Sequence, residues 1–334
     1  MLAAFIILAS LALPTASFSE TSIASWNLKR FDEHSSNIPA ITKVAAHFDL
    51  IALQEVMSER AVATLVQTLK AETGVTWKFM TSHAIGRGSY KERYAFVWRE
   101  DEISYVDGAV VYLDTQDVFA REPMSARFRT KEGDTFVAAN IHVLYGKSVS
   151  DRIPEIKALS SYWTWLSRSF PTDPIFLMGD FNMDPNDHSF NGLRPYANAT
   201  MRKGGSTLST RQGRFPNLYD HIWISNGVKL RNGKAGILNF PELLSMNHEV
   251  ARNSVSDHAP TYVVFDDINV ESYNPAPQRM PAPQVEVRAN KNSGIYHLPH
   301  CDSYEVMGTS RNLVIFGSET QAKSQGYRPA RNCG

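Results

Sequence analysis

The stretch PIFLMGDFNMDP, from Pro174 to Pro185, decides the fold that the sequence predicts. Its continuous apolar run, residues 175–178, is typical of a strand buried on both faces, and Gly179 follows where the backbone can turn. Asp180 and Asn182 stand at alternate positions after it, so they face the same way at the carboxyl end of a strand, where α/β sheets place their sites. The alternative is an ordinary Asx turn, because Asp and Asn also favour turns.

Other predicted strands also begin or end at polar side chains, which favours a shared site over isolated turns. The predicted strands cover residues 21–28, 50–53, 77–82, 90–98, 106–113, 121–129, 135–142, 175–178, 219–224 and 261–265. Helices are predicted at 39–47, at 61–69 behind a Ser58 cap, and at 151–170. The residues at the strand ends are Asn27, Glu55, Glu92, His142, Asp180, Asn182, Asp220, Asp257 and His258.

This set of side chains is rich in oxygen, holds two histidines and contains no cysteine. It therefore suits a hard cation such as Mg²⁺, Mn²⁺ or Ca²⁺ better than Zn²⁺. Hydrolysis of a phosphodiester needs a deprotonated water, a cation for the phosphoryl charge and an acid near the leaving oxygen. The set fits that reaction.

Composition and charge restrict the possible partners. The chain has 334 residues, is 43% hydrophobic and 20% charged, and carries 34 basic and 34 acidic side chains. It is long enough for a large core with an appendage, and no global basic field points to a polyanion. Any contact with nucleic acid must therefore rest on a local arrangement of Arg, Lys and metal.

The sequence divides into four predicted parts. Residues 1–19 are typical of a secretory signal, and their apolar run is shorter than the roughly 20 residues that span a bilayer. Alternating helices and strands predict a layered α/β domain at 20–266. A proline-rich linker is predicted at 267–293 and a small second unit at 294–334. We expect a secreted or periplasmic protein that does not insert stably into a membrane.

Six motifs occur in the order found in a known superfamily: WN at 26–27, LQE at 53–55, NIH at 140–142, GDFN at 179–182, YDHI at 219–222 and SDH at 256–258. With them, the chain resembles the endonuclease/exonuclease/phosphatase superfamily over residues 22–265. SYKERYAF at 89–96 and FAREP at 119–123 are similar to its deoxyribonuclease I branch. The resemblance implies a four-layer sandwich of two packed, mostly antiparallel sheets flanked by helices.

The resemblance also implies a metal ion and two histidines at the site. Glu55 would be the main ligand of Mg²⁺ or Mn²⁺, assisted by Asn27, and Asp257 would complete the metal environment. His142 and His258 would flank the scissile phosphate.

Further roles follow from the same motifs. Glu92 would orient His142, and Asp220 would orient His258, so that each pair acts as an acid or base. Asp180 would help activate the attacking water, and Asn182 would bind a phosphate oxygen.

The resemblance also implies contacts with DNA and a second cation site, although the sequence departs from the family pattern at both. Tyr90 and Arg121 match residues that touch the DNA backbone, whereas Met57 stands where that branch has a minor-groove arginine. The loop at 114–122 is shorter than in the family but keeps part of a structural Ca²⁺ site, namely Asp117, Phe119 and Glu122.

The carboxyl-terminal unit resembles the Ada-like metal-binding modules through IYHLPHC at 295–301, NLVIF at 312–316 and GYRPARNC at 326–333. That pattern usually has a second cysteine where Ala330 stands. We therefore expect a disulfide between Cys301 and Cys333, and the alternative is a zinc site that adds His297 and His300 to both cysteines.

These observations predict a secreted, divalent-metal-dependent endonuclease that acts on DNA with low sequence specificity. One alternative is a phospholipid or inositol-phosphate phosphodiesterase of the same superfamily. The other is a toxin-like subunit that acts through a protein partner.

Overall fold

The computed structural model describes residues 20–34, 36–270, 287–298, 301, 303–316 and 319–331. The chain separates into a large unit up to Pro275 and a small unit from Ala276. The predicted signal segment, residues 1–19, and residues 271–286 of the predicted linker lie outside the described residues. Among the helices that are described, none has the length and apolar character needed to cross a membrane.

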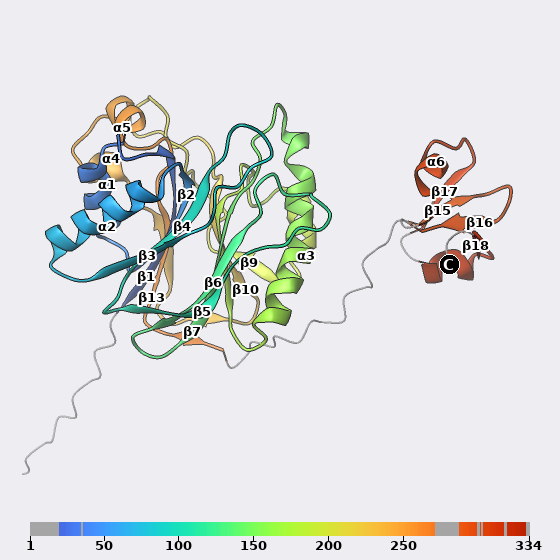
Figure 1. Cartoon of the computed structure of the whole chain (residues 1–334), viewed down its shortest axis with the longest axis horizontal. Coiled ribbons are helices and arrows are strands. Elements are labelled where there is room, and N and C mark those ends of the chain that lie inside the picture. The colour runs from blue at the N-terminus through green and yellow to red at the C-terminus, as the bar shows by residue number, and fades with distance from the viewer. Residues whose placement is uncertain are drawn as a thin grey trace, which may run out of the picture. The chain divides into compact units, whose positions relative to one another are not determined.

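The large unit is built on two six-stranded sheets (Figure 1). The first sheet has the order β12 (Lys234–Ile237), β13 (Thr261–Phe265), β1 (Thr21–Phe31), β2 (Leu50–Val56), β4 (Arg93–Arg99) and β3 (Trp77–Thr81). The second has the order β5 (Ile103–Val111), β6 (Met124–Thr130), β7 (Thr135–His142), β8 (Ile175–Asp180), β10 (Asp220–Ser225) and β9 (Ala197–Ala199). Only the β1–β2 and β7–β8 pairs of these described sheets are parallel.

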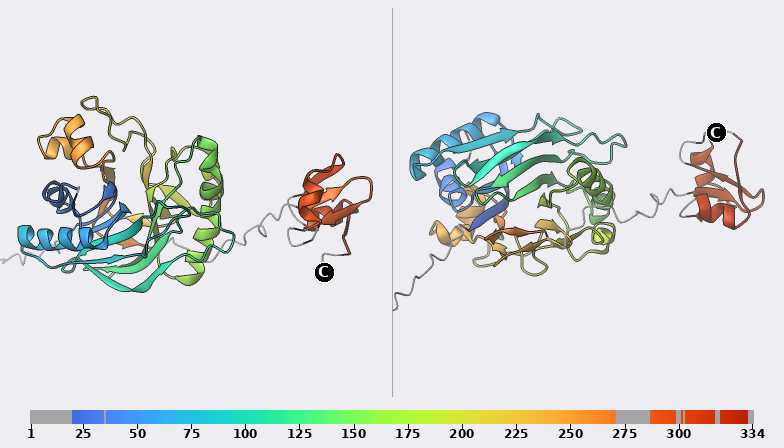
Figure 2. Two further views of the ribbon diagram at one scale, coloured as in Figure 1. Left: turned by 45° about the horizontal axis from the view of Figure 1, so that its top comes forward. Right: turned by 90° about the horizontal axis from the view of Figure 1, so that it is seen from below.

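Helices cover the outer faces of both sheets, which gives four layers (Figures 1 and 2). α1 (Ile38–Ala45) and α2 (Glu59–Thr73) share an apolar cluster with the first sheet, and α3 (Ile153–Ser169) shares one with the second. A third cluster joins the inner faces of the two sheets. In it the rings of Phe96 and Phe128 meet edge to face with their centroids 5.4 Å apart. The predicted four-layer sandwich is confirmed.

Short elements complete the large unit. They are the 3₁₀ turns η1 (Val149–Asp151) and η2 (His188–Gly192), the helices α4 (Phe240–Leu243) and α5 (His248–Ser254), and the strands β11 (Lys229–Leu230) and β14 (Ile268–Asn269).

Strand β4 differs from its sequence prediction. The sequence predicted a half-exposed strand over 90–98, but β4 begins at Arg93 and its interior is buried on both faces. Phe96 faces the second sheet, while Ala95 and Val97 pack against the helix side of the first sheet. Aromatic and small apolar side chains alternate here, and both kinds are buried because the strand lies between two layers.

A glycine sets the spacing between β7 and β8. Gly179 pairs with Ile141 across the parallel ladder and has a φ of 153°. A Cβ atom on Gly179 would lie 1.8 Å from the carbonyl oxygen of Ile141, so a larger residue would push the strands apart. This close approach places His142 directly opposite Asp180 at the ends of the two strands.

A buried polar bridge joins the two sheets beside this point. Gln54 Nε2 donates to Asn140 Oδ1 at 2.7 Å, and Asn140 Nδ2 donates to the carbonyl oxygens of Leu53 and Ala95 at 3.0 and 3.2 Å. Because unpaired polar groups are costly in an apolar interior, these bonds fix how the strand ends of the two sheets meet.

The small unit is a four-stranded sheet with two short helices. Its elements are β15 (Val287–Asn290), β16 (Ile295–His297), α6 (Tyr304–Gly308), β17 (Leu313–Phe316), α7 (Glu319–Ser324) and β18 (Arg328–Pro329). The predicted linker at 267–293 is too long, because β15 already belongs to this sheet and β14 lies in the large unit.

The cysteine predictions concern this small unit. Cys301 is buried, but Cys333 and His300 lie outside the described residues. The Cys301–Cys333 disulfide, the zinc alternative with His297 and the Ada-like character of the unit therefore stay predictions.

Candidate active site

A cleft of about 980 Å³ opens where the central strands of both sheets end. Of the residues predicted from the sequence, it is lined by Glu55, Tyr90, Arg121, His142, Asp180, Asn182, Asp257 and His258. Asn27, Glu92 and Asp220 are buried behind that lining and contact it through hydrogen bonds. The structure thus brings together the strand ends that the sequence predicted to converge.

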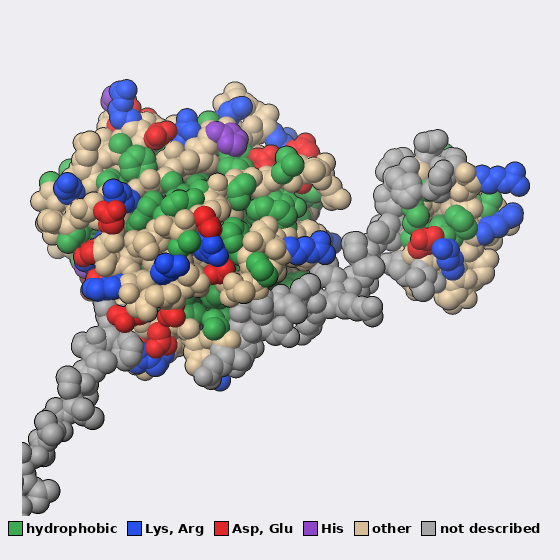
Figure 3. Space-filling view, turned by 60° about the horizontal axis from the view of Figure 1, so that its bottom comes forward, with side chains coloured by type: hydrophobic (Ala, Val, Ile, Leu, Met, Phe, Trp, Pro, Cys, Tyr) green, Lys and Arg blue, Asp and Glu red, His purple; other side chains and the backbone are tan. Residues whose placement is uncertain are grey.

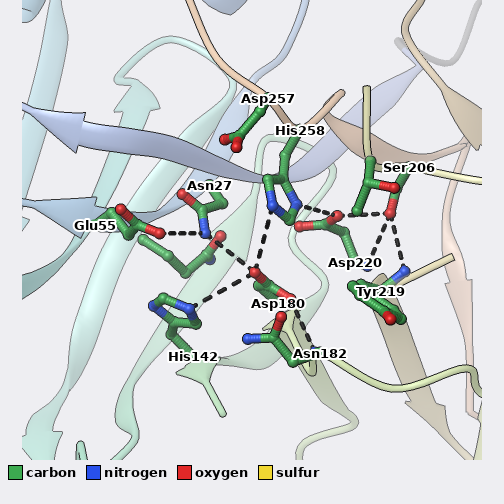
Figure 4. Close-up of polar contacts among 12 residues, drawn as sticks. Asn27, Glu55, His142, Asp180, Asn182, Ser206, Tyr219, Asp220, Asp257 and His258 are labelled. Atoms are coloured by element: carbon green, nitrogen blue, oxygen red, sulfur yellow. Dashed lines mark hydrogen bonds and ion pairs between the residues drawn. The ribbon is translucent and has the colours of Figure 1, made fainter. Parts of the chain in front are cut away.

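Asp180 lies at the centre of this group (Figure 4). Its Oδ2 accepts a hydrogen bond from Asn27 Nδ2 at 3.1 Å. The same oxygen lies 3.6 Å from His142 Nε2 and 3.7 Å from His258 Nε2. One carboxylate oxygen therefore faces both imidazoles, of which His142 ends β7 of the second sheet and His258 stands just before β13 of the first.

Asn182 follows Asp180 in a left-handed conformation, with a φ of 51°. Its backbone N–H donates to Asp180 Oδ1 at 2.9 Å, and its side-chain Nδ2 donates to the Val143 carbonyl at 2.8 Å. The Asx turn and the shared site are therefore both present, because the turn holds Asn182 in the cleft wall beside Asp180.

His142 is held by the carboxylate of Glu92, which stands directly before β4 of the first sheet. Its Nδ1 lies 2.7 Å from Glu92 Oε1, and Glu92 Oε2 accepts from the Tyr90 hydroxyl at 3.0 Å. Arg121 Nε donates to the His142 carbonyl at 3.1 Å and lies 3.5 Å from Glu92 Oε1. Burial and Arg121 lower the pKa of His142, but Glu92 and Asp180 outweigh them and raise it above its ordinary value.

His258 forms a second pair of the same kind. Its Nδ1 lies 2.7 Å from Asp220 Oδ2, an oxygen that also accepts from Ser206 Oγ at 2.6 Å. The Ser206 hydroxyl in turn accepts from the backbone N–H groups of Tyr219 and Asp220, each at 3.0 Å. Burial lowers the pKa of His258, but Asp220 and Asp180 outweigh it and raise the pKa to about 10.

Glu55 projects from a bulge between Leu53 and Val56 of β2. It has a φ of 56°, and its Oε1 accepts from Asn27 Nδ2 at 3.1 Å. Asn27 therefore bridges Glu55 and Asp180 with one amide group. Asp257 also lines the cleft, beside His258 in the sequence, and its Oδ2 is 3.3 Å from Arg252 Nη2.

The oxygens of this wall suit a hard divalent cation. Glu55 is half-buried and lines the cleft, so its carboxylate is accessible to an ion from that side. Among the described residues, another group brings ligand atoms within 4.8 Å of one another, namely Asp180, Asp220 and His258. There the His258 imidazole is already hydrogen-bonded to Asp220 through Nδ1, so we treat that group as an acid–base pair beside a carboxylate.

The sequence pattern of the Endonuclease/Exonuclease/phosphatase family matches residues 24–258. The chain belongs to this family. A Deoxyribonuclease of Thioalkalivibrio sp. (strain K90mix) is 43% identical over 273 residues, which cover 79% of this chain and 76% of that protein. Deoxyribonuclease-1 of Gallus gallus is 30% identical over 271 residues, which cover 73% and 91% of the two chains.

Solved structures of the family share the fold. A family protein from Bacteroides thetaiotaomicron matches with a TM-score of 0.54 and 18% identity, over 75% of this chain and 99% of its own. A mannosyl-6-phosphatase from the same organism matches with a TM-score of 0.53 and 16% identity, over 75% and 99%. The four-layer sandwich is thus the architecture of the family.

The two predicted DNA-contacting residues of this family member are placed differently. Tyr90 is 37% exposed in the cleft wall, whereas Arg121 is only 7% exposed. Arg121 is largely occupied with Glu92 and the His142 carbonyl. A contact of either side chain with DNA stays a prediction, and for Arg121 the structure adds a role in holding the His142 pair.

The predicted Ca²⁺ loop has its own internal contacts. Asp114 Oδ2 accepts from the backbone N–H of Phe119 at 2.7 Å, and Asp117 Oδ1 pairs with Arg87 Nη2 at 3.1 Å. The calcium site of Asp117, Phe119 and Glu122 stays a prediction.

Several residues of the cleft were missed by sequence reasoning. Those with charged or aromatic side chains are Lys29, Arg30, Tyr145, Tyr219 and Arg252. The pair Lys29–Arg30 follows the WN motif after one residue, Leu28, and could have been found as basic residues at a strand end. Ser206 carries no such signal, because it stands in a loop rich in Gly, Ser and Thr.

Proposed function

We propose that this protein is a divalent-metal-dependent endonuclease that hydrolyses phosphodiester bonds of DNA with low sequence specificity. The observation that carries the proposal is the convergence of His142 Nε2 and His258 Nε2 on one oxygen of Asp180, at 3.6 and 3.7 Å. Each imidazole is oriented through Nδ1 by its own carboxylate, at 2.7 Å in both pairs.

Hydrolysis joins a water oxygen to phosphorus, breaks the bond to the leaving ester oxygen and moves one proton from the water to that oxygen. Asp180 is buried between the two imidazoles and can orient the water and accept its proton. His258, held in its charged form by Asp220, can donate to a phosphoryl or leaving oxygen. His142 would donate on the opposite side, and Asn182, which lines the cleft, would contact a phosphate oxygen.

A metal ion, Mg²⁺ or Mn²⁺, would be held by Glu55 with Asn27, and Asp257 would complete its environment. When bound, it would stabilise the negative charge that grows on the phosphoryl oxygens.

The substrate assignment is supported by relatives and by the cations of the cleft. The two relatives named above are called deoxyribonucleases. Lys29, Arg30 and Arg252 line the cleft and can contact phosphates, which positions a strand but reads little sequence. Basic and acidic side chains are interspersed on the face shown in Figure 3. Because the chain carries 34 of each, attraction of DNA would rest on the cations of the cleft.

Export to the periplasm or the cell exterior belongs to the proposal, on the strength of the signal-like residues 1–19. The Cys301–Cys333 disulfide would be stable in such a compartment.

Plasmid nicking tests the proposed function. The full chain is assayed with Mg²⁺, with Mn²⁺ and with EDTA, beside the variants His142→Ala and His258→Ala. His188→Ala is the matched control, because His188 is exposed on η2 and outside the cleft lining. We expect nicking that needs the metal, is lost in both site variants and persists in the control.

Two results would contradict this proposal in different ways. If the wild-type protein leaves DNA intact but cleaves sphingomyelin or inositol phosphates, DNA is not its substrate. Full nicking activity in both histidine variants would show that the active site is assigned to the wrong residues.

A further inference from the structure

Tyr145 is an aromatic side chain at the cleft that the proposed reaction does not use. It stands three residues after His142, the last residue of β7, and lines the same cleft. Its side chain is 59% exposed, although a tyrosine of this size usually buries most of its ring. An exposed ring beside a reacting centre is a candidate contact for substrate.

A buried arginine holds this ring in place. The guanidinium carbon of Arg152 lies 4.2 Å from the centroid of the Tyr145 ring, and Arg152 Nε donates to the Tyr145 carbonyl at 2.9 Å. Arg152 is itself buried and also donates to the carbonyl of Asn182. One face of the ring is therefore covered by a fixed cation, and the ring is tied to the loop that carries Asn182.

A second ring with an arginine lies on the other sheet's side of the cleft. Tyr90 stands three residues before Arg93, the first residue of β4, and the guanidinium carbon of Arg30 lies 5.5 Å from its ring centroid. Tyr90 also donates to Glu92, which limits its freedom. Both rings line the same cleft as His142 and Asp180, so a strand bound at the reacting centre can meet either ring.

We propose that the outer face of Tyr145 stacks on a nucleobase of the DNA strand being cut, next to the scissile phosphate. The proposal rests on the proposed function, because it names a subsite for that substrate. A base can offer a free face only where the strand is unpaired or locally opened. The subsite therefore favours single-stranded DNA, for which aromatic stacking is the usual sequence-independent contact.

The test uses Tyr145→Ala and Tyr145→Phe in the full chain. The substrate is a single-stranded oligonucleotide in which one nucleotide at a time is made abasic, with cleavage of each bond followed on a sequencing gel. We expect Tyr145→Ala to raise KM about tenfold with little change in kcat, because one stacking contact is worth roughly that factor. Tyr145→Phe keeps the ring and should behave as wild type.

The decisive comparison is between intact and abasic strands. On the oligonucleotide that lacks the stacked base, wild type and Tyr145→Ala should have equal KM values. Tyr105→Ala is the control, because Tyr105 is an exposed tyrosine of β5, at 41%, outside the cleft lining. It should leave KM unchanged.

Binding without cleavage separates this proposal from the proposed function. Anisotropy of a labelled oligonucleotide is measured in EDTA on His142→Ala and on His142→Ala combined with Tyr145→Ala. A tenfold weaker complex for the double variant supports stacking even if the wild type cleaves no DNA. Equal affinities, or a loss that is the same on intact and abasic strands, would overturn the base-stacking subsite.

Discussion

The two histidine pairs have the same geometry but different surroundings. In both pairs, His142 with Glu92 and His258 with Asp220, one residue belongs to a strand of the second sheet and its partner stands just before a strand of the first. Each imidazole nitrogen lies 2.7 Å from its carboxylate. Beside Glu92 stands the guanidinium of Arg121, whereas beside Asp220 stands the uncharged hydroxyl of Ser206.

The different neighbours separate the two pairs electrostatically. Arg121 opposes the positive charge of His142, while the residues around His258 include Asp180, Asp220 and Asp257, which all favour its charge. Similar hydrogen bonds can thus give imidazoles of unequal proton affinity, which is how one site obtains two acid–base roles. We expect His258 to be the more firmly protonated partner.

Removing either imidazole should give the largest effect and should test whether the pairs act as one unit. His142→Ala and His258→Ala should each lower kcat roughly 10²–10⁴-fold, the usual contribution of a positioned acid or base. The double variant should have a kcat only slightly below that of the less active single variant, because the effects of residues that act together are not additive. Single-turnover nicking rates measure this. Multiplicative losses would mean that the two pairs work independently.

Exchanging the orienting carboxylates should separate stability from activity. Glu92→Gln leaves the buried Arg121 guanidinium without its charge partner, so we expect about 3 kcal/mol less free energy of unfolding. Asp220→Asn leaves the His258 imidazole beside it, which can lose its proton, unlike a guanidinium. It should therefore cost less stability, while its kcat falls roughly 10²-fold. Urea unfolding and nicking rates check both. Equal stability losses would show that Arg121 does not distinguish the pairs.

His221 shows how burial affects the pKa of a histidine whose ring is hydrogen-bonded to no carboxylate among the described residues. His221 stacks on Phe181 with the ring centroids 4.8 Å apart, and its Nε2 lies 2.9 Å from the Leu218 carbonyl. Burial lowers its pKa to about 4.

His221 therefore predicts a loss of stability in acid. The folded pKa lies below the unfolded value of roughly 6.5, so only the unfolded state takes up a proton between those values. The full contribution is present above pH ~6.5 and falls by up to about 3 kcal/mol as the pH drops towards 4. Urea unfolding of wild type and His221→Phe at pH 7 and 4.5 measures it. The same pH dependence in both proteins would rule out His221 as the cause.

Ser206→Ala should give the smallest change and sharpen the contrast at Asp220. It removes one donor to Asp220 and leaves two backbone N–H groups without their acceptor, which should cost about 1–2 kcal/mol of stability. Thermal unfolding measures the loss, and Ser209→Ala in the same loop is the control. A variant as stable as wild type would show that the serine does not support the second pair.

Much of the fold was accessible from the sequence because its strands are short apolar runs with clear ends. β13 occupies the predicted residues 261–265, and α2 begins behind the predicted Ser58 cap, whose side chain accepts from the Arg60 N–H. The burial of β4 was not accessible, because alternation of large and small apolar side chains is the same for one buried face and for two.

The convergence of the polar strand ends was predicted, but their supporting contacts were not. The neighbours of Asp180 depend on the close approach of Gly179 to Ile141, and Ser206 reaches Asp220 from a loop with no periodic pattern. Such contacts are set by tertiary packing, which local sequence patterns do not predict.

The backbone of Glu55 makes stability and activity compete at one position. A residue with a side chain is roughly 1 kcal/mol less stable than glycine in the left-handed conformation that Glu55 adopts. Glycine at this position would relieve that strain and delete the cleft-facing carboxylate together. A laboratory selection for heat resistance alone would therefore be drawn towards an inactive protein here, whereas selection for nuclease activity would retain the strained residue.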